Sequence, residues 1–140
     1  DRCFLYIPCV YFAHDYHKQR IVQAKAGDTV HTDLFAINWP PNSPVRVLRN
    51  SVVEAAGGKL WGYHPDKLPR EVIAHDNGQP MLKFDTNSPL RTTSGNLEAM
   101  ALYAGEGAAQ ITAIRPAREI LDALMREAAA TLTALAARVS

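Results

Sequence analysis

The chain has 140 residues, of which 47% are hydrophobic and 21% charged, and this is the composition of a folded globular domain rather than of a disordered segment. Its formal net charge is +1, so composition gives no electrostatic reason to expect nucleic acid or another strongly charged partner. No run of about 18 apolar residues occurs, and we therefore expect no membrane-spanning segment.

The first twelve residues are apolar but do not resemble a signal peptide. They open with Asp1 and carry no basic region ahead of the apolar run. We predict a strand over Cys3–Ile7 that ends at Pro8. Cys3 and Cys9 are the only cysteines, and their spacing fits no zinc or CxxC pattern, so we expect both to be reduced and buried in a cytoplasmic protein.

The next part of the chain predicts helix, strand, loop and helix in turn. Residues 13–26 are rich in helix formers and stop at a glycine, which indicates a short, partly exposed helix. The β-branched and aromatic run Thr29–Ile37 predicts a strand. Three prolines between Trp39 and Pro44 predict a loop. Apolar and basic residues at helical spacing then predict a helix over 45–56.

The middle of the chain contains the clearest hairpin pattern. Residues 59–70 hold one glycine and two prolines, Pro65 and Pro69, and are predicted to be irregular. Glu71–Phe84 is predicted to form a β-hairpin, because Asn77-Gly78 is the pair that a type I′ turn requires. Residues 85–95 are polar and show no periodicity, which indicates a loop.

Two helices are predicted in the last part of the chain. A short one covers 96–104, and small residues follow it at 105–109. A longer one covers 116–139, with Pro116 at its first position. Its apolar residues fall on one face. They are Leu121, Leu124, Met125, Ala128, Leu132, Leu135, Ala136 and Val139.

Candidate chemical groups are few. His14 and His17 would share a helix face, as two metal ligands do, but no third ligand has a matching spacing, and we favour surface histidines. His31 and Asp33 would share a strand face, where exposed polar residues are favoured over a catalytic pair. No nucleophile elbow, Walker or Rossmann glycine pattern occurs, so these residues alone assemble no catalytic site.

Five sequence blocks occur in the same order as in a known family. The chain resembles the C-terminal part of the nitronate monooxygenases, also called 2-nitropropane dioxygenases. The blocks are A-H-D-Y-H-K at Ala13–Lys18, T-V-H-T-D-L-F at Thr29–Phe35, R-V-L-R-N at Arg46–Asn50, L-E-A-M-A-L-Y-A-G at Leu97–Gly105 and I-R-P-A-R-E-I at Ile114–Ile120.

This resemblance implies a fold and a function. Members of the family are FMN-dependent enzymes that oxidise small alkyl nitronates with O₂, and a TIM barrel of roughly 250 residues or more carries their flavin. The chain would be one α+β domain, a small cap of that barrel with one β-hairpin and a long C-terminal helix. Within it, 1–12 would be a remnant of the last barrel strand, 13–115 the cap region and 116–139 the terminal helix. The absent initiating Met agrees with a fragment, and we expect it to need an N-terminal barrel domain for activity.

The resemblance also implies cofactor contacts near the end of the fourth block. Tyr103, Gly105 and Glu106 would lie toward the FMN, whereas no catalytic residue and no metal ligand is expected in this chain. Family members typically carry Gln at the position of Glu106, and an ionised carboxylate accepts hydrogen bonds without donating them. The family also has Gly-Thr-Arg-Phe where this chain begins with Asp1-Arg2-Cys3-Phe4.

An alternative function rests on the terminal helix. Its apolar face, Leu121–Val139, needs a partner surface to cover it. The chain would then be a non-enzymatic interaction or dimerisation module with a helical tail.

Overall fold

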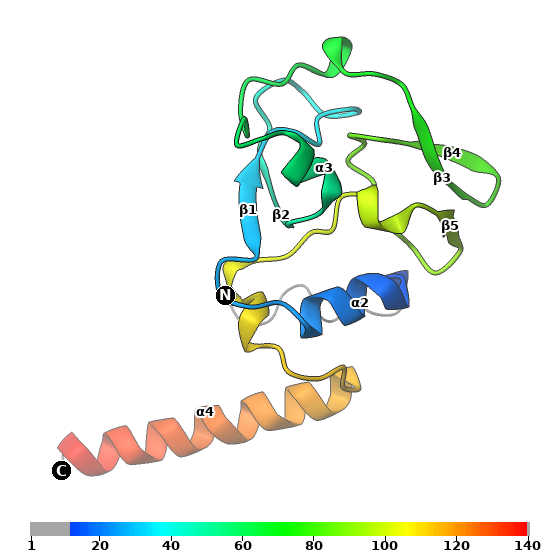
Figure 1. The fold of residues 1–140 in the computed structure, drawn as a ribbon. Coiled ribbons are helices and arrows are strands. Elements are labelled where there is room, and N and C mark those ends of the chain that lie inside the picture. Colours follow the sequence, from blue (N-terminus) through cyan, green and yellow to red (C-terminus); the bar gives the residue numbers. More distant parts are fainter. Residues whose placement is uncertain (1–11, 140) are drawn as a thin grey trace.

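A computed structural model of the chain describes residues 12–139 (Figure 1). The predicted strand Cys3–Ile7 and both cysteines lie outside these residues. The elements, in chain order, are α2 (Asp15–Val22), β1 (Thr29–Thr32), β2 (Val45–Leu48), α3 (Ser51–Ala55), η1 (Pro65–Lys67), β3 (Val72–Asp76), β4 (Gln79–Leu82), β5 (Thr93–Gly95), η2 (Leu97–Ala99), η3 (Glu106–Gln110) and α4 (Ala117–Val139).

The fold is a small α+β arrangement with two antiparallel sheets and a C-terminal helix. Strands β1 and β2 form one sheet, in which Thr29 is opposite Leu48 and Thr32 is opposite Val45. The other sheet has the order β4-β3-β5. Helix α2 lies below the first sheet in Figure 1, and α4 extends beneath the body of the protein.

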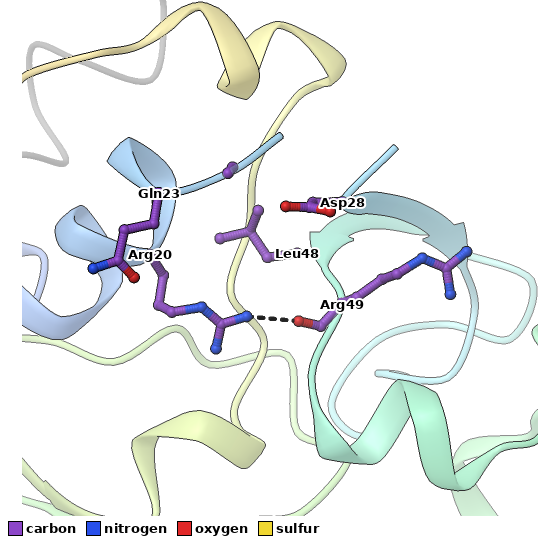
Figure 2. Close-up of a pocket in the computed structure, with 6 residues that line it drawn as sticks. Arg20, Gln23, Asp28, Leu48 and Arg49 are labelled. Carbon is purple, nitrogen blue, oxygen red and sulfur yellow. Dashed lines mark hydrogen bonds between the residues drawn. The ribbon is translucent and has the colours of Figure 1, made fainter. Parts of the chain in front are cut away.

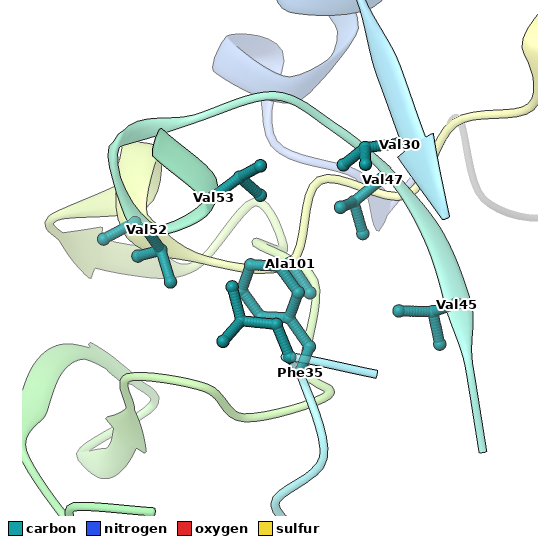
Figure 3. Packing of buried hydrophobic residues seen from close by; sticks show 9 residues of the cluster. Val30, Phe35, Val45, Val47, Val52, Val53 and Ala101 are labelled. Atoms are coloured by element: carbon teal, nitrogen blue, oxygen red, sulfur yellow. The ribbon is translucent and has the colours of Figure 1, made fainter. Parts of the chain in front are cut away.

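The main core lies between strand β2, helix α3 and the chain on either side of η2. Phe35 and Val47 are fully buried at its centre, with Val52 and Val53 of α3 on one side and Ala101 on another (Figure 3). Close packing of these apolar side chains is the main stabilising contribution to the body of the protein.

The predicted hairpin and two of the predicted helices are confirmed. Asn77 and Gly78 connect β3 to β4, and both have positive φ, 48° and 80°, as a type I′ turn demands. Helix α2 occupies the middle of the predicted range 13–26, and α4 occupies nearly all of 116–139.

The predicted helix over 45–56 is wrong in its first half. Residues 45–48 form strand β2, because Val45 and Val47 are buried with Arg46 between them, which is the period of a strand. The helix begins only at Ser51. Asn50 has extended backbone, and its side-chain oxygen accepts a hydrogen bond from the Val53 N–H at 3.1 Å, as an N-cap does.

The predicted strand Thr29–Ile37 is too long, since β1 ends at Thr32. The Thr32 Oγ1 donates to the Leu60 carbonyl at 2.6 Å and accepts from the Leu34 N–H at 3.0 Å. These contacts turn the chain inward, so that Leu34 and Phe35 both enter the core instead of alternating between two faces.

The predicted helix over 96–104 is also wrong. Only Leu97–Ala99 form a short 3-10 turn, and the chain then runs extended beside β2. The Leu48 N–H donates to the Leu102 carbonyl at 2.8 Å, and the Ala104 N–H donates to the Arg46 carbonyl at 3.3 Å. The segment 100–104 therefore packs like an additional strand, although its sequence is alanine-rich.

The predicted loop 85–95 ends in a strand. Residues Thr93–Gly95 form β5 against β3, with Gly95 opposite Ala74. Gly95 has a φ of 122°, and a Cβ there would lie 2.7 Å from the Ala74 Cα. Glycine therefore permits this close approach of the two strands.

Candidate functional site

Residues from distant parts of the sequence meet where helix α2 contacts the extended segment 100–104. Leu48 and Leu102 are buried there, and Tyr16, Ile21 and Ala24 of the α2 region pack against them. This junction contains Tyr103, and it leads directly into Gly105 and Glu106.

His17 is the buried polar group of this junction, with only 5% of its surface exposed. Its Nε2–H donates to the Tyr103 carbonyl at 3.0 Å, because a carbonyl can only accept. Its Nδ1 then accepts from the Ser88 hydroxyl at 3.1 Å. The expectation that His17 is a surface histidine is therefore wrong.

Burial lowers the pKa of His17 below the ordinary value of 6.5, and the nearby Arg20 cation adds to this effect, although the bond to the Tyr103 carbonyl opposes it. The imidazole is thus kept neutral, with one donor and one acceptor nitrogen. His14 has a different role, since its Nδ1 accepts from the Tyr16 N–H at 3.0 Å and caps the start of α2.

The side chain of Tyr103 is partly buried as well. Its hydroxyl donates to the Thr86 carbonyl at 2.6 Å. Burial raises the pKa of Tyr103 to about 12, and the negative charge of Asp85 contributes to the increase. The phenol therefore stays protonated at neutral pH and acts as a hydrogen-bond donor.

Glu106 lies at the surface just after this tyrosine and forms an ion pair with strand β2. The Arg46 Nη2 is 2.8 Å from the Glu106 Oε1, with 76% of the glutamate side chain exposed. Gly105, at the start of η3, has open space where a Cβ would be. A pair as exposed as this one contributes little to stability.

A pocket of about 300 Å³ lies on the other side of the junction, between α2 and β2 (Figure 2). Arg20, Asp28, Leu48 and Arg49 line it, together with Gln23 and Ala24. Leu48 and Ala24 are its apolar lining residues, while Arg20, Asp28 and Arg49 bring charges of both signs.

Arg20 and Asp28 of this pocket already have hydrogen-bond partners within the protein. Arg20 donates to the Tyr16 hydroxyl at 2.9 Å and to the Arg49 carbonyl at 2.7 Å. An oxygen of Asp28 accepts from the Lys25 N–H at 2.7 Å. Arg20 therefore joins α2 to the end of β2 rather than offering a free guanidinium to a ligand.

His31 and Asp33 do not form a pair on one strand face. His31 is exposed, and its ring lies 5.2 Å from that of Trp61 in an edge-on arrangement. Asp33 is buried beyond the end of β1, where it accepts from the Gly62 N–H at 3.0 Å. The prediction that they share a face is wrong, because the strand ends before Asp33.

The described residues offer no metal site, since no three His, Asp or Glu side chains gather within 12–139. In the same residues, no helix has both the length and the apolar character needed to cross a bilayer. Every buried side-chain nitrogen and oxygen of this part of the chain has a hydrogen-bond partner.

Tyr103, Gly105 and Glu106 do not fit a flavin phosphate as they are arranged here. The Tyr103 hydroxyl is bound to a backbone carbonyl, and the Glu106 carboxylate would repel an anion. Gly105 lies in open space rather than against a surface that a phosphate could share. Contacts of these residues with another part of the cofactor stay a prediction.

Sequence reasoning missed the central position of His17. The available signal was its spacing from Ile21, one turn later on the same helix face. A histidine in line with an apolar residue on a short helix can be buried with its ring nitrogens bonded. Ser88 gave no signal, because it contacts His17 from a loop 71 residues away.

Comparisons with known proteins add no family to this description. No family model, curated protein or solved structure matches the chain.

Proposed function

We propose that this chain is the C-terminal part of an FMN-dependent oxidoreductase of the nitronate monooxygenase type. It would cap a separate barrel domain, and the small-molecule substrate would be an alkyl nitronate. The flavin in such an enzyme carries the redox chemistry, while the protein binds, orients and excludes water. The present chain would shape the cap and would be inactive alone.

One observation carries this proposal: four of the five blocks that resemble the family lie together in space. The block Thr29–Phe35 begins with β1, which pairs with β2 in the block Arg46–Asn50. The block Leu97–Gly105 runs along the other side of β2, through the bond from Leu48 to Leu102. The block Ala13–Lys18 reaches it through His17 and Tyr103.

The side chains of these blocks support one another too. The Asn50 Nδ2 donates to the carbonyls of Glu98 and Met100, at 2.8 and 2.9 Å. Just after the block Arg46–Asn50, the Ser51 hydroxyl and the Glu98 carboxylate are also hydrogen-bonded. Contacts of this kind between the blocks are what a shared cap domain would require, and in this sense they support the proposal.

A fusion experiment tests the proposal. The chain is joined behind the flavin-binding barrel of a nitronate monooxygenase from which the natural C-terminal part has been removed. We expect the fusion to bind FMN and to consume O₂ when an alkyl nitronate is added, whereas the truncated barrel alone is far less active. The free chain is titrated with FMN in parallel.

Two outcomes would contradict the proposal. One is a folded, FMN-loaded fusion no more active than the truncated barrel. The other is tight FMN binding or nitronate-dependent O₂ uptake by the free chain. A fusion that carries Gly95→Ala, a change that disturbs the β3–β5 contact, is a control for a cap that must be folded.

A second candidate is a non-enzymatic interaction module with a helical tail. The observation that favours it is the exposure of the large apolar side chains on α4, which reaches 71% at Met125 and 67% at Leu132. The oligomeric state of the chain tests this candidate, because a module of this kind associates whether or not flavin is present.

A further inference from the structure

The turn between β3 and β4 has a chemical property that neither candidate function uses. Asn77 is followed by a glycine, whereas every other asparagine of the chain is followed by a residue with a side chain. Asn77 and Gly78 are both exposed. Among residues 12–139, nothing but its chain neighbours lies within 4 Å of the place that a Cβ of Gly78 would occupy. The peptide bond after Asn77 is therefore open to water and to the asparagine side chain.

We propose that Asn77 is a site of spontaneous deamidation, and that the reaction opens the β3–β4 hairpin. The Gly78 backbone nitrogen attacks the Asn77 Cγ and forms a cyclic imide, while the side-chain amide leaves as ammonia with the proton of the Gly78 N–H. Water then adds to either ring carbonyl and breaks the bond from that carbonyl to nitrogen. The product is aspartate or isoaspartate at position 77. Glycine favours the attack because it has no Cβ beside the reacting nitrogen.

The Asn77 amide has to leave its present contacts before this ring can close. Its Nδ2 donates to an oxygen of Asp76 and to the Thr92 hydroxyl, both at 3.4 Å. These distances exceed the usual range of about 2.7–3.2 Å for an N–H···O hydrogen bond, so the amide is held weakly. The Thr92 hydroxyl is itself fixed by Asp76, to which it donates at 2.6 Å. Thr92 is therefore a restraint on the reaction.

The hairpin is placed where local opening costs little. Strand β4 lies at the edge of its sheet, with β3 as its neighbour (Figure 1). Pro80 has no N–H and is typical of an edge strand. The pairing of the two strands is also interrupted by a register shift between Val72 and Ala74. Opening of such an edge requires less free energy than global unfolding, so the folded protein can reach the geometry of ring closure.

Either product disturbs the contacts around Asp76. A new carboxylate at position 77 replaces the amide beside the Asp76 carboxylate, and like charges repel. Asp76 also accepts from the Thr93 hydroxyl at 3.1 Å, at the start of β5. Isoaspartate adds one backbone carbon to a turn of two residues, which displaces Asp76 from its partner Gln79. Isoaspartate should therefore open the hairpin more than aspartate.

Peptide mapping of the full chain by mass spectrometry tests the site. The folded protein is incubated at neutral and mildly alkaline pH, and conversion of each asparagine is followed. Asn42 is the internal control, since it is exposed and has a positive φ of 61°, against 48° at Asn77, but precedes Ser43. Asn77 should react faster than Asn42, and faster still at higher pH, because the attacking nitrogen must lose its proton. Equal rates, or no reaction at Asn77, overturn the proposal.

Thr92→Val tests the restraint. With one hydrogen bond of the amide removed, the reaction at Asn77 should accelerate by roughly twofold to tenfold. Thr131→Val is the matched control, because its hydroxyl bonds within α4 and the rate at Asn77 should not change. The buried Asn50 reports opening of the whole protein. An unchanged rate in Thr92→Val, or an equal acceleration at Asn50, overturns the role of Thr92.

Amide hydrogen exchange tests the effect on the hairpin. The isoaspartate form is separated by chromatography and compared with the unmodified chain. The amides of β4 should exchange faster in it, and those of β1, in the other sheet, should be unchanged. Asn77→Asp adds the charge without the extra backbone carbon and should have a smaller effect, below about fivefold. Unchanged exchange in β4 of the isoaspartate form overturns the opening of the hairpin.

Discussion

His17 and Tyr103 are 86 residues apart in the sequence, and the imidazole Nε2–H of the first donates to the backbone carbonyl of the second at 3.0 Å. Ser88 binds the other ring nitrogen. Three segments that share no local sequence signal are thereby held together by one side chain. The protonation state of this imidazole should therefore affect the free energy of unfolding of the protein.

Acidification should destabilise the protein through His17. Its pKa in the folded state lies below 6.5, so the unfolded chain takes up this proton first as the pH falls. The stabilising contribution is complete above about pH 6.5 and decreases below it, by at most about 1.4 kcal/mol per pH unit. Urea unfolding between about pH 8 and pH 5 measures this dependence.

His17→Gln is the matched variant for this measurement. Its amide can still donate to the Tyr103 carbonyl but does not titrate, so the loss of stability below about pH 6.5 should become smaller. His75→Gln, on an exposed position of β3, should leave the dependence as it is. An unchanged pH profile in His17→Gln would show that another group causes the effect.

Alkaline pH should weaken the Tyr103 contact. The pKa of this phenol is about 12 in the folded protein, above the ordinary value of 10, so the folded state holds its proton longer. The contribution is present below pH 10 and is lost as the pH rises toward 12. Tyr103→Phe should cost about 1 kcal/mol at neutral pH, because the bond to the Thr86 carbonyl is lost. The phenolate absorbance of the two proteins, followed against pH, locates the titration.

Asn50→Ala should destabilise the protein by about 2–4 kcal/mol in chemical unfolding. The substitution removes the cap of α3 and leaves two carbonyls, the partly buried one of Glu98 and the buried one of Met100, without their donor. Asn50→Asp separates the two roles, since a carboxylate still caps the helix but cannot donate. An aspartate variant as stable as the natural protein would mean that the two carbonyl contacts contribute nothing.

Two glycines should differ strongly in their response to replacement by alanine. At Gly95, a Cβ would lie 2.7 Å from both the Ala74 Cα and the Ile73 carbonyl oxygen, on a backbone with positive φ. Gly95→Ala should therefore cost more than about 2 kcal/mol. Gly105→Ala, where the Cβ meets open space, should change stability by less than about 0.5 kcal/mol. Thermal unfolding compares the pair directly, and equal shifts would contradict the β3–β5 geometry.

The parts of the fold that were predicted correctly depend on local signals. The Asn77-Gly78 turn is set by the φ values that its two residues can adopt, and α4 is set by its own apolar period. The errors lie where the apolar residues of one segment fit both the helical period and the alternation of a strand. Val45, Leu48 and Val52 have helical spacing, yet Val45 and Val47 also alternate as in a strand. The extended segment 100–104, about fifty residues away, decides in favour of the strand.

The candidate site was less predictable than the fold. Tyr103 and Glu106 could be named from the resemblance, but the partners that define their environment come from elsewhere. Thr86 accepts from the tyrosine, and Arg46 pairs with the glutamate. The buried position of His17 depends in the same way on Leu102 and Ser88, so the composition of α2 alone could not reveal it.

The bond from Leu48 to Leu102 also affects when the protein can fold. Strand β2 has β1 on one side and segment 100–104 on the other, so its pairing is incomplete until Ala104 has been synthesised. The hydrogen bond from Asn50 to the Met100 carbonyl likewise cannot form before Met100 has been synthesised. Pairings this distant in sequence slow folding, since a long loop must close before they form. On the ribosome, the body of the protein would therefore assemble late, only after Ala104 has left the exit tunnel.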